Sequence, residues 1–568
     1  MQTTMADAPY AERILVGGGE EGKRTLAEAR SRTMWQAICD SAAGHPDKDC
    51  LVGARDNGEI GRLTYSGLVE RVRNFSTGLA RTGVRRGDRV VLWMTNSLDW
   101  VVASFSIMRL GATVVPVNTF LKPPEIRYVI EQSGARHLIM LDGFRKLDMP
   151  AMLGEICPAF AAADQPGNLC EPSLPDLRHV IMLSRTGRRH PGTHDFATVE
   201  EIGRSDGGQW QDIAETMAGA VLPTDLGMVK YTSGSTGFPK GVMLEQGGIV
   251  ASGVIHGCRV DATDKDIFFS MMPFFHGGGS IWGQMTMLIN GGTLVFTEAF
   301  DPKLAVMLLD REQPTMMMGV LATEVIDEAL AQGKTFPSLR TAHVPSEEGR
   351  KVMPNVDYNI MPFGLTETYG PAAVASRRDP PDKLGCSGQL LDGNQLRVVD
   401  PVTLKDVAPG EPGEAWLKGN VMRGYWNKPV ETANVFTEDG WLRSEDLISV
   451  DEDGFISYVG RIKLMLKVGG ENVSIEEVES VVESHEAIAQ CGAVGVPDER
   501  RQEVVRVYVV ARPGHAVPED ELRLWLEARL ARFKQPRDIV FVDELPRLAN
   551  GKLDRVTLQR WADEEAAA

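Results

Sequence analysis

The sequence contains few cysteines, and their spacing suits neither a metal site nor a set of disulfides. Seven cysteines are scattered through 568 residues without a Cys-x-x-Cys pair. Structural zinc sites and redox-active disulfides use closely spaced pairs, and secreted disulfide frameworks use an even, dense set. We therefore expect free thiols in a reducing cytoplasm.

The chain also lacks long apolar runs and an excess of positive charge. Its most apolar stretch, residues 101–117, is interrupted by Arg109, and crossing a bilayer needs about 20 apolar residues. We expect a buried helix and a strand there, no membrane span, and no secretory signal in the acidic N-terminal segment. The 60 Lys and Arg against 78 Asp and Glu residues give a net charge of −18. Without a basic patch, such a surface repels nucleic acid, so we expect no nucleic-acid partner.

The order of hydrophobic patterns predicts an α/β fold. Helix and strand patterns alternate, with helices predicted at 65–82, 98–110 and 124–132 and strands at 89–94, 113–116 and 137–141. Such alternation is typical of a mainly parallel sheet covered by helices. A second α/β run follows at 227–359, whereas the Pro- and Gly-rich segment 144–224 predicts long surface connections.

The C-terminal third has a different pattern. Short apolar runs punctuated by Gly and Pro predict a β-rich subdomain over about residues 384–460. A compact α+β unit follows, with helices predicted at 475–484 and 519–532 and strands at 489–496 and 504–511. Because 568 residues exceed what one core organises, we expect several domains. They are an N-terminal domain over 1–460, a hinge at 461–463 and a small, mobile C-terminal domain over 464–568.

The clearest motif is Tyr231–Gly241, which reads Tyr-Thr-Ser-Gly-Ser-Thr-Gly-Phe-Pro-Lys-Gly and follows an apolar stretch. Small residues let backbone N–H groups approach phosphate oxygens, hydroxyl groups add donors, and Lys240 adds positive charge. A flexible linker is the competing interpretation, but linkers rarely place Pro-Lys-Gly between apolar strands. Residues 17–23 imitate a phosphate-binding loop, but Arg24 stands where a hydroxyl is needed. We interpret that segment as disordered.

The 231–241 motif resembles the phosphate-binding signature of the adenylate-forming superfamily of acyl-CoA synthetases, luciferases and nonribosomal adenylation domains. The resemblance covers roughly residues 63–558 and keeps the family's motif order. The further motifs are Phe363–Thr368 (adenine and metal), Trp441–Asp446 (ribose), 460–463 (hinge), 467–473 (thiol tunnel) and 551–555 (catalytic lysine). The resemblance implies the acyl-CoA ligase branch.

The resemblance also implies roles for individual residues. The expected catalytic residues are Lys552, Lys463, Gly470, His276 and Thr366. The expected nucleotide-binding residues are Thr232, Ser233, Gly234, Ser235, Thr236, Gly237, Lys240, Phe363, Gly364, Glu367, Asp446, Arg461 and Lys467. The expected acyl pocket is formed by Phe275, His276, Gly278, Gly364 and Leu365, and the expected Mg²⁺ ligands are Glu367 and Thr236.

These roles fit the chemistry of adenylation, in which a carboxylate attacks the α-phosphate of ATP. Mg²⁺ held by Glu367 would neutralise phosphate charge, and Lys552 would bridge carboxylate and phosphate oxygens in the transition state. Asp446 suits the two ribose hydroxyls, since a carboxylate accepts two hydrogen bonds. Phe363 would stack on the adenine, although an apolar core role would leave the same pattern. By resemblance, the C-terminal domain then rotates about Lys463 for thiol attack.

The segment Phe274–Gly279 admits two interpretations. Its His-Gly-Gly-Gly run is similar to a lipase oxyanion loop, but the chain lacks the Gly-x-Ser-x-Gly elbow of such hydrolases. In the superfamily it matches the aromatic-His motif beside the acyl pocket. Nearby methionines predict either core or an adaptable apolar pocket, with core favoured for most of them, and a bulky, apolar acid is expected.

Three departures from the family pattern lie on the nucleotide side. A shorter stretch without Gly-Gly replaces the usual Gly-Gly-Ala-Pro loop between Arg340 and Phe363. The ribose motif reads Ser-Glu-Asp where Thr-Gly-Asp is usual, which adds Glu445, and Glu245-Gln246 stand where a hydroxyl and a histidine are common. Acidic groups near ATP are expected to be unfavourable.

The leading hypothesis is a cytoplasmic ligase that joins a carboxylic acid to CoA through acyl-AMP, with ATP, CoA and Mg²⁺ as cofactors. The departures leave open a restricted form that transfers only a preformed acyl-adenylate to CoA, supplied by a separate adenylating ligase. A stand-alone adenylation enzyme that loads a carrier protein is the runner-up, and a luciferase-like oxygenase shares the fold. A non-catalytic acyl-adenylate-binding protein is the alternative from a different class.

Overall fold

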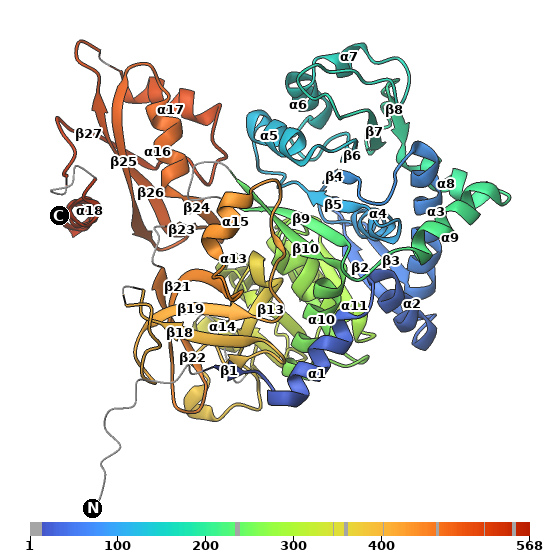
Figure 1. Ribbon diagram of the computed structural model, residues 1–568, viewed down its shortest axis with the longest axis horizontal. Coiled ribbons are helices and arrows are strands. Elements are labelled where there is room, and N and C mark those ends of the chain that lie inside the picture. The colour runs from blue at the N-terminus through green and yellow to red at the C-terminus, as the bar shows by residue number, and fades with distance from the viewer. Residues whose placement is uncertain are drawn as a thin grey trace, which may run out of the picture. The chain divides into compact units, whose positions relative to one another are not determined.

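The computed structural model describes residues 14–232, 239–344, 346–356, 362–401, 403–461, 465–515, 517–547 and 553–567. The chain divides into two compact units. The larger comprises Met1–Val117, Glu131–Lys230 and Val242–Gly460, and the smaller comprises Asn118–Ile130, Tyr231–Gly241 and Arg461–Ala568. Helices and strands alternate along the chain, so the predicted α/β class is confirmed (Figure 1).

An eight-stranded sheet organises the first part of the larger unit. Its order is β20-β10-β9-β5-β4-β6-β7-β8, and neighbours from β9 to β8 pair in parallel. The strands are Gly424–Tyr425 (β20), Lys240–Glu245 (β10), Leu226–Thr232 (β9), Thr113–Pro116 (β5), Arg89–Trp93 (β4), His137–Leu141 (β6), His179–Leu183 (β7) and Thr193–Asp195 (β8). Because parallel strands end at the same edge, the polar residues that follow them gather there.

A six-stranded sheet with the order β14-β13-β11-β12-β2-β3 follows the same principle, with only the β2–β3 hairpin antiparallel. Its strands are Thr341–His343 (β14), Met316–Val320 (β13), Ile267–Ser270 (β11), Thr293–Thr297 (β12), Asp49–Ala54 (β2) and Ile60–Thr64 (β3). Helix α4 (Leu98–Arg109) contacts β4 and β5 of one sheet and β2 and β3 of the other. Each of its residues from Trp100 to Arg109 is buried, as expected of a helix enclosed by core on all sides.

The other helices along this stretch of chain are α1 (Gly19–Arg30), α2 (Met34–Gly44), α3 (Tyr65–Thr82), α5 (Pro123–Ser133), α10 (Gln246–Val260), α11 (Gln284–Ile289), α12 (Pro302–Glu312), α13 (Thr323–Ala331) and α14 (Glu347–Val352). The bounds of α3 show why the sequence prediction was accurate. The Thr64 side chain accepts a hydrogen bond from the Gly67 N–H, and Gly83 ends the helix at φ 100°. A hydroxyl cap and a left-handed glycine are strong signals for a helix start and stop.

Two sequence predictions are wrong. The segment 144–224 contains α6 (Met149–Ile156), α7 (Ala159–Ala162), β7, β8, α8 (Phe196–Ser205) and α9 (Gln209–Gly219). Two of its aspartates are helix N-caps, since Asp148 and Asp195 accept hydrogen bonds from the N–H groups of Ala151 and Thr198. Residues 17–23 are also ordered: the Gly17 N–H donates to the Asn394 carbonyl, and α1 follows.

The β-rich part of the larger unit contains a five-stranded and a three-stranded sheet. The first has the order β1-β18-β19-β21-β22, and the second is β15-β16-β17. The strands of the five-stranded sheet are Leu15–Val16 (β1), Gln395–Val399 (β18), Gly413–Lys418 (β19), Leu442–Val450 (β21) and Ile456–Arg461 (β22). Those of the three-stranded sheet are Phe363–Leu365 (β15), Gly370–Val374 (β16) and Gln389–Leu390 (β17). Helix α15 (Pro429–Val435) precedes β21 in the chain. Phe363, Leu396, Leu417 and Ile448 share one core.

The smaller unit is built on a five-stranded sheet that is covered on both faces. Its strands are Met465–Val468 (β23), Glu471–Ser474 (β24), Ile488–Asp498 (β25), Gln502–Ala511 (β26) and Asp538–Phe541 (β27), and its helices are α16 (Ile475–Glu483), α17 (Glu519–Glu527) and α18 (Arg555–Ala567). Val505 and Val507 on β26 share a core with α16 and α17, whereas Val504 and Tyr508 share one with α18. This is the alternation expected of a strand.

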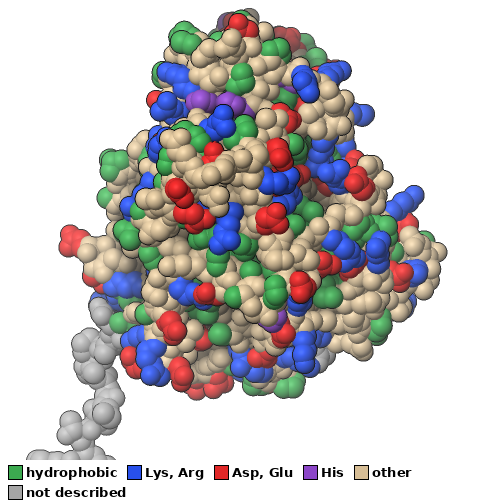
Figure 2. Space-filling model, turned by 90° about the vertical axis from the view of Figure 1, so that its right-hand side faces the viewer, with side chains coloured by type: hydrophobic (Ala, Val, Ile, Leu, Met, Phe, Trp, Pro, Cys, Tyr) green, Lys and Arg blue, Asp and Glu red, His purple; other side chains and the backbone are tan. Residues whose placement is uncertain are grey.

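On the face in Figure 2, Lys, Arg, Asp and Glu side chains are interspersed. Among the described helices, none combines the length and apolar character needed to cross a membrane.

Candidate active site

The aromatic-His segment follows strand β11 and forms a compact, buried turn. Phe274 and Phe275 are buried, His276 is half-buried, and a π-helical turn, η1, spans Gly278–Gly283. A Cβ atom on Gly279 would lie 2.3 Å from the Pro273 carbonyl oxygen, so only glycine fits. Single π-turns are rare and are frequent at functional sites.

The far end of η1 is held by a buried histidine on α10. The Trp282 indole donates to His256 Nε2, His256 Nδ1 lies 2.9 Å from Thr286 Oγ1, and Thr286 donates to the Trp282 carbonyl at 2.7 Å. Burial lowers the pKa of His256 to about 3. The imidazole is therefore neutral, and it acts as a structural link between α10 and η1.

Glu367, a predicted metal ligand, lies beside Tyr425. The Tyr425 hydroxyl donates to Glu367 Oε1 at 2.9 Å, and the Met422 N–H donates to the Glu367 carbonyl at 2.7 Å. The pKa of Tyr425 is raised, first by burial and then by the negative charges of Glu367 and Glu445. Tyr425 therefore lies close to two carboxylates, one from the metal motif and one from the ribose motif.

The ribose motif lies on β21 and is anchored by a buried glutamate on β19. Asp446 is 3% exposed and Glu414 is fully buried. Glu414 accepts hydrogen bonds from the Glu445 N–H at 3.2 Å and from the Arg443 and Trp416 side chains at 3.0 and 2.8 Å. Glu445 has φ 60°, a left-handed conformation that favours glycine. The backbone here keeps the shape of a glycine-containing motif although a glutamate occupies the position.

The adenine motif begins in the core. Phe363 is 3% exposed and packs in the β-rich core, which is the alternative role that the sequence left open, so adenine stacking by Phe363 stays a prediction. Gly364 is exposed, whereas Leu365 and Thr366 are half-buried. A Cβ atom on Gly364 would lie 2.2 Å from the Gly370 carbonyl oxygen, which explains the glycine at this position.

Only the ends of the phosphate motif are described. Thr232 ends β9 and Lys240 begins β10, and both are half-buried. The Tyr128 hydroxyl donates to the Pro239 carbonyl at 3.1 Å, and the Tyr128 and Tyr231 rings meet edge to face. The predicted ligands Ser233, Gly234, Ser235, Thr236 and Gly237 lie outside the described residues, as do the hinge lysine Lys463 and the catalytic lysine Lys552. The Arg461 side chain is likewise outside them.

In the smaller unit, the predicted thiol-tunnel loop is a tight β-hairpin. Strands β23 and β24 pair antiparallel through Lys467↔Asn472 and Val468↔Glu471. The turn residues Gly469 and Gly470 have φ 59° and 87°, as in the two-residue turns that favour Gly-Gly. Gly470 is exposed with open space at its Cβ position, and Lys467 is also exposed.

The residues that flank Lys552 are fixed to the core of the smaller unit. Arg547 and Leu553 form a β-bridge. Arg555 donates to both carboxylate oxygens of Glu479, at 2.6 and 2.7 Å, and Glu479 also accepts from the Ala493 N–H at 2.7 Å. Bidentate pairs of this kind are strong and directional.

The family profile of the AMP-binding enzymes matches residues 39–426, and that of the AMP-binding enzyme C-terminal domain matches residues 477–552. The first match spans more than half of the chain. The chain belongs to the AMP-binding enzyme family.

Relatives of this AMP-binding enzyme include CoA ligases. It is 32% identical over 514 residues to a Rhodococcus jostii CoA ligase for a propanoyl acid on a methyl-dioxo-octahydroindene ring system, with 88% of this chain and 93% of that protein covered. It is 31% identical to a feruloyl-CoA synthase of an Amycolatopsis species, with 88% and 94% covered. The solved structure of Bacillus subtilis o-succinylbenzoate CoA synthetase with a product analogue matches with a TM-score of 0.73 at 25% identity, covering 93% of this chain and 98% of that chain. The enzyme is an AMP-forming acid–thiol ligase of the acyl-CoA synthetase type, which confirms the predicted superfamily.

One departure of this AMP-binding enzyme from the family pattern has a structural explanation. Glu245 pairs with Arg30 at 2.6 Å and with Arg423 at 2.9 Å. Gln246 is fully buried and donates to the Met108 carbonyl at 2.8 Å. Because two arginines neutralise Glu245, the expectation that it opposes ATP is corrected. The expectation that an acidic group opposes ATP now concerns Glu445, which acts on Tyr425.

Sequence reasoning missed Tyr425, Asn96 and Lys230. Tyr425 lies far along the chain from Glu367 and joins no motif. Asn96 follows β4 at the carboxyl edge of the sheet, where a polar residue is a usable signal. Lys230 is a charged residue inside the apolar strand that precedes the phosphate motif, and that break in the pattern could have been noticed.

Proposed function

We propose that this AMP-binding enzyme forms the CoA thioester of a bulky, hydrophobic carboxylic acid through an acyl-AMP intermediate. The observation that carries the proposal is the cluster around Tyr425, where the Glu367 carboxylate lies next to the ribose motif. The octahydroindene and feruloyl acids of the relatives support a bulky substrate. The buried aromatic segment Phe274–Phe275 supports an apolar one.

In the first half-reaction, a carboxylate oxygen of the acid bonds to the α-phosphorus of ATP, and the bond to pyrophosphate breaks. Glu367 fits a Mg²⁺ ion, because it is a half-exposed carboxylate with one oxygen bound to Tyr425 and Mg²⁺ prefers oxygen ligands. Bound Mg²⁺ supplies charge neutralisation at the phosphates. Among the described residues, no cluster of three or more His, Cys, Asp or Glu could hold a metal by itself, so substrate oxygens would complete such a site.

In the same half-reaction, the role proposed for Asp446 is to accept both ribose hydroxyls, and that for Lys552 is to bridge the carboxylate and the α-phosphate. His276 would lie beside the acid. In the second half-reaction, the CoA sulfur bonds to the acyl carbon and AMP leaves. The side-chain-free turn at Gly470 would then leave room for the pantetheine arm.

A second candidate is an enzyme restricted to the thioesterification step, which receives its acyl-adenylate from a separate ligase. Glu445 favours this candidate, since its carboxylate acts on Tyr425, the partner of Glu367, and like charges near polyphosphate are unfavourable. The absence of a Gly-Gly pair between Arg340 and Phe363 favours it as well.

Two assays on the purified enzyme test both candidates with a panel of hydrophobic acids. One measures pyrophosphate release from ATP and the acid, and the other measures consumption of CoA with synthetic acyl-adenylates. Activity in both assays supports the two-step ligase, whereas activity in the second alone supports the restricted enzyme. Activity in neither, across bicyclic and aryl acids, contradicts the proposed substrate class. Lys552→Ala should abolish only the first activity, with Lys405→Ala, at an exposed site, as the control.

A further inference from the structure

Lys230 is a buried lysine that holds the aromatic-His segment. It lies in β9, is 3% exposed, and its Nζ atom donates to the Phe275 carbonyl at 2.9 Å and to Ser280 Oγ at 2.8 Å. The Ser280 hydroxyl in turn donates to the His276 carbonyl at 2.9 Å. Lys230 therefore binds the carbonyl that precedes His276 directly, and it binds the carbonyl of His276 through the Ser280 hydroxyl in η1.

The surroundings of Lys230 make the uncharged amine accessible near neutral pH. No carboxylate pairs with it among the residues that the structure describes. Burial lowers its pKa to about 7. A neutral amine has two N–H donors, one for each of its two acceptors, whereas an ammonium group would bring a third donor and a charge into the core. The neutral form matches this site donor for donor.

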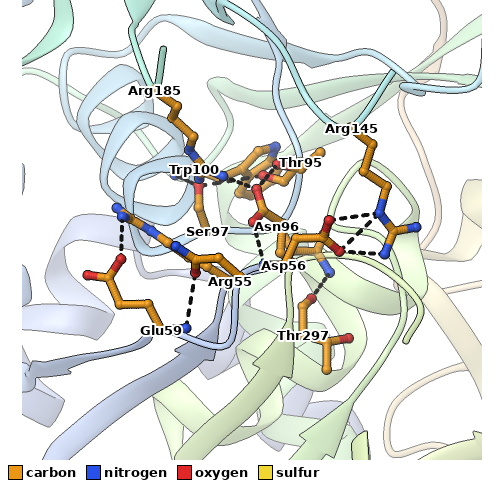
Figure 3. Close-up of polar contacts among 12 residues, drawn as sticks. Arg55, Asp56, Glu59, Thr95, Asn96, Ser97, Trp100, Arg145, Arg185 and Thr297 are labelled. Carbon is orange, nitrogen blue, oxygen red and sulfur yellow. Dashed lines mark hydrogen bonds and ion pairs between the residues drawn. The ribbon is translucent and has the colours of Figure 1, made fainter. Parts of the chain in front are cut away.

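Asn96 holds the same segment from another strand of the eight-stranded sheet. Its side-chain amide donates to the Met272 carbonyl at 3.0 Å and to the Thr297 carbonyl at 3.1 Å, and its oxygen accepts from the Phe274 N–H at 2.7 Å. Asn96 is 5% exposed. Figure 3 shows Asn96 between Ser97 and Thr297, at the edge where β4 and β12 end. The two side chains together anchor the segment before and after Phe274.

A purely structural role does not explain a lysine at this place. A methionine would fill similar space in the apolar strand without the cost of burying an amine. Buried groups with strongly shifted pKa values are concentrated at functional sites. The segment contains three consecutive glycines, Gly277, Gly278 and Gly279, whose backbone is less restricted than that of other residues. External hydrogen bonds can set its conformation.

We infer that Lys230 and Asn96 are positioning residues for the acyl half of the site, which fix the backbone that presents Phe275 and His276 to the acid. This inference rests on the proposed function and adds the residues that determine acid binding. Neither residue touches the nucleotide-binding cluster around Tyr425 in the described hydrogen bonds. Their loss should therefore affect the acid and leave ATP and CoA binding intact.

The test compares steady-state constants of Lys230→Met, Lys230→Arg and Asn96→Ala with those of the wild type. We expect Lys230→Met to raise the KM for the acid about tenfold, as for the loss of two hydrogen bonds that position a binding segment. The KM values for ATP and CoA should stay within about twofold. Lys230→Arg, which retains donors, should recover part of the acid KM. The matched control is Lys48→Met, because Lys48 also donates to a backbone carbonyl, that of Gly291 at 2.8 Å, but at the start of β12.

A double-mutant cycle provides the decisive readout. If Lys230 and Asn96 hold one segment, the double variant should raise the acid KM by less than the product of the single effects. If Lys230→Met fails to fold, Ser280→Ala removes only one link and should raise the acid KM about threefold. The dissociation constant of a non-hydrolysable acyl-sulfamoyl adenosine should rank the variants in the same order as their KM values for the acid.

The outcomes separate this inference from the proposed function. Unchanged acid KM values in active variants overturn the inference, and so does an equal rise in the KM for ATP, which would indicate general damage. A wild-type enzyme that uses no acid in either assay instead overturns the proposed function.

Discussion

Replacing Glu445 by glycine should both stabilise the enzyme and improve its use of ATP. Glu445 has φ 60°, and a left-handed conformation costs a residue with a Cβ atom about 1 kcal/mol relative to glycine. Its carboxylate also acts on Tyr425, which binds Glu367. The substitution removes a backbone strain and a negative charge in one step.

The electrostatic part can be bounded from Coulomb's law. At an effective dielectric constant of about 20, the Glu445 carboxylate and a phosphate charge bound roughly 8 Å from it would repel each other by about 2 kcal/mol. Glu445 is half-exposed, so solvent screening reduces this to about 1 kcal/mol, which corresponds to about a fivefold fall in the KM for ATP.

A pair of variants separates the two effects. Glu445→Gly should raise Tm by about 2 °C and lower the KM for ATP, whereas Glu445→Gln removes the charge, keeps the strain, and should lower the KM alone. The measurements are thermal unfolding and pyrophosphate release at varied ATP. A higher KM for ATP in both variants would refute the reasoning, because Glu445 would then assist binding of the metal-bound nucleotide.

Three further predictions concern other parts of the molecule. Burial, and after it the imidazole of His179, lowers the pKa of His137 to about 3, and burial lowers the pKa of His179 to about 4. Both rings therefore stay neutral in the folded state, whereas the same histidines in the unfolded chain take up protons below about pH 6.5. Stability should therefore fall as the pH drops below 6.5, by about 2 kcal/mol at pH 5 for His137 alone, and His137→Phe should flatten this dependence in urea unfolding. Gly470→Val should slow CoA consumption from acyl-adenylate at least tenfold and spare pyrophosphate release, because a side chain would occupy the open turn. Arg555→Gln should lower pyrophosphate release about tenfold with thioesterification intact, since the bidentate bond to Glu479 is lost next to the lysine motif.

Each of these predictions has a matched control. His515→Gln changes an exposed histidine and should leave the pH dependence as in the wild type. Gly514→Val tests the same strain at φ 81° in the smaller unit, away from the hairpin. Arg506→Gln removes a comparable ion pair, with Asp538 at 3.0 Å. If a control variant reproduces the effect of its partner, the local explanation is wrong.

Local signals in the sequence were sufficient for much of the fold. Helix α3 was predicted with its observed bounds because Thr64 and Gly83 mark its ends, and β5 and β6 were predicted because they are short, continuous apolar runs. The segment 144–224 was misread because Asp148 and Asp195 favour both loops and helix N-caps, and composition alone does not separate the two.

The candidate site was only partly predictable. Motifs identified Glu367 and Asp446, but the partner of Glu367 is Tyr425, which lies in β20 and is held against β10. Glu245 was expected to oppose ATP because its two arginines, Arg30 and Arg423, are distant in the sequence. Long-range pairing of this kind is set by tertiary structure and leaves no periodic trace in the chain.

The position of helix α4 has a consequence for how the enzyme folds. Because α4 packs on β4 and β5 and also on β2 and β3, neither α/β sheet can complete its core without the other. The two sheets should melt in one cooperative transition. A fragment that ends near residue 220 lacks β9, β10 and β20 of the eight-stranded sheet and β11 to β14 of the six-stranded sheet, so it should remain a loosely packed, protease-sensitive chain. During synthesis, the eight-stranded sheet would reach its stable form only after more than half of the polypeptide has been made.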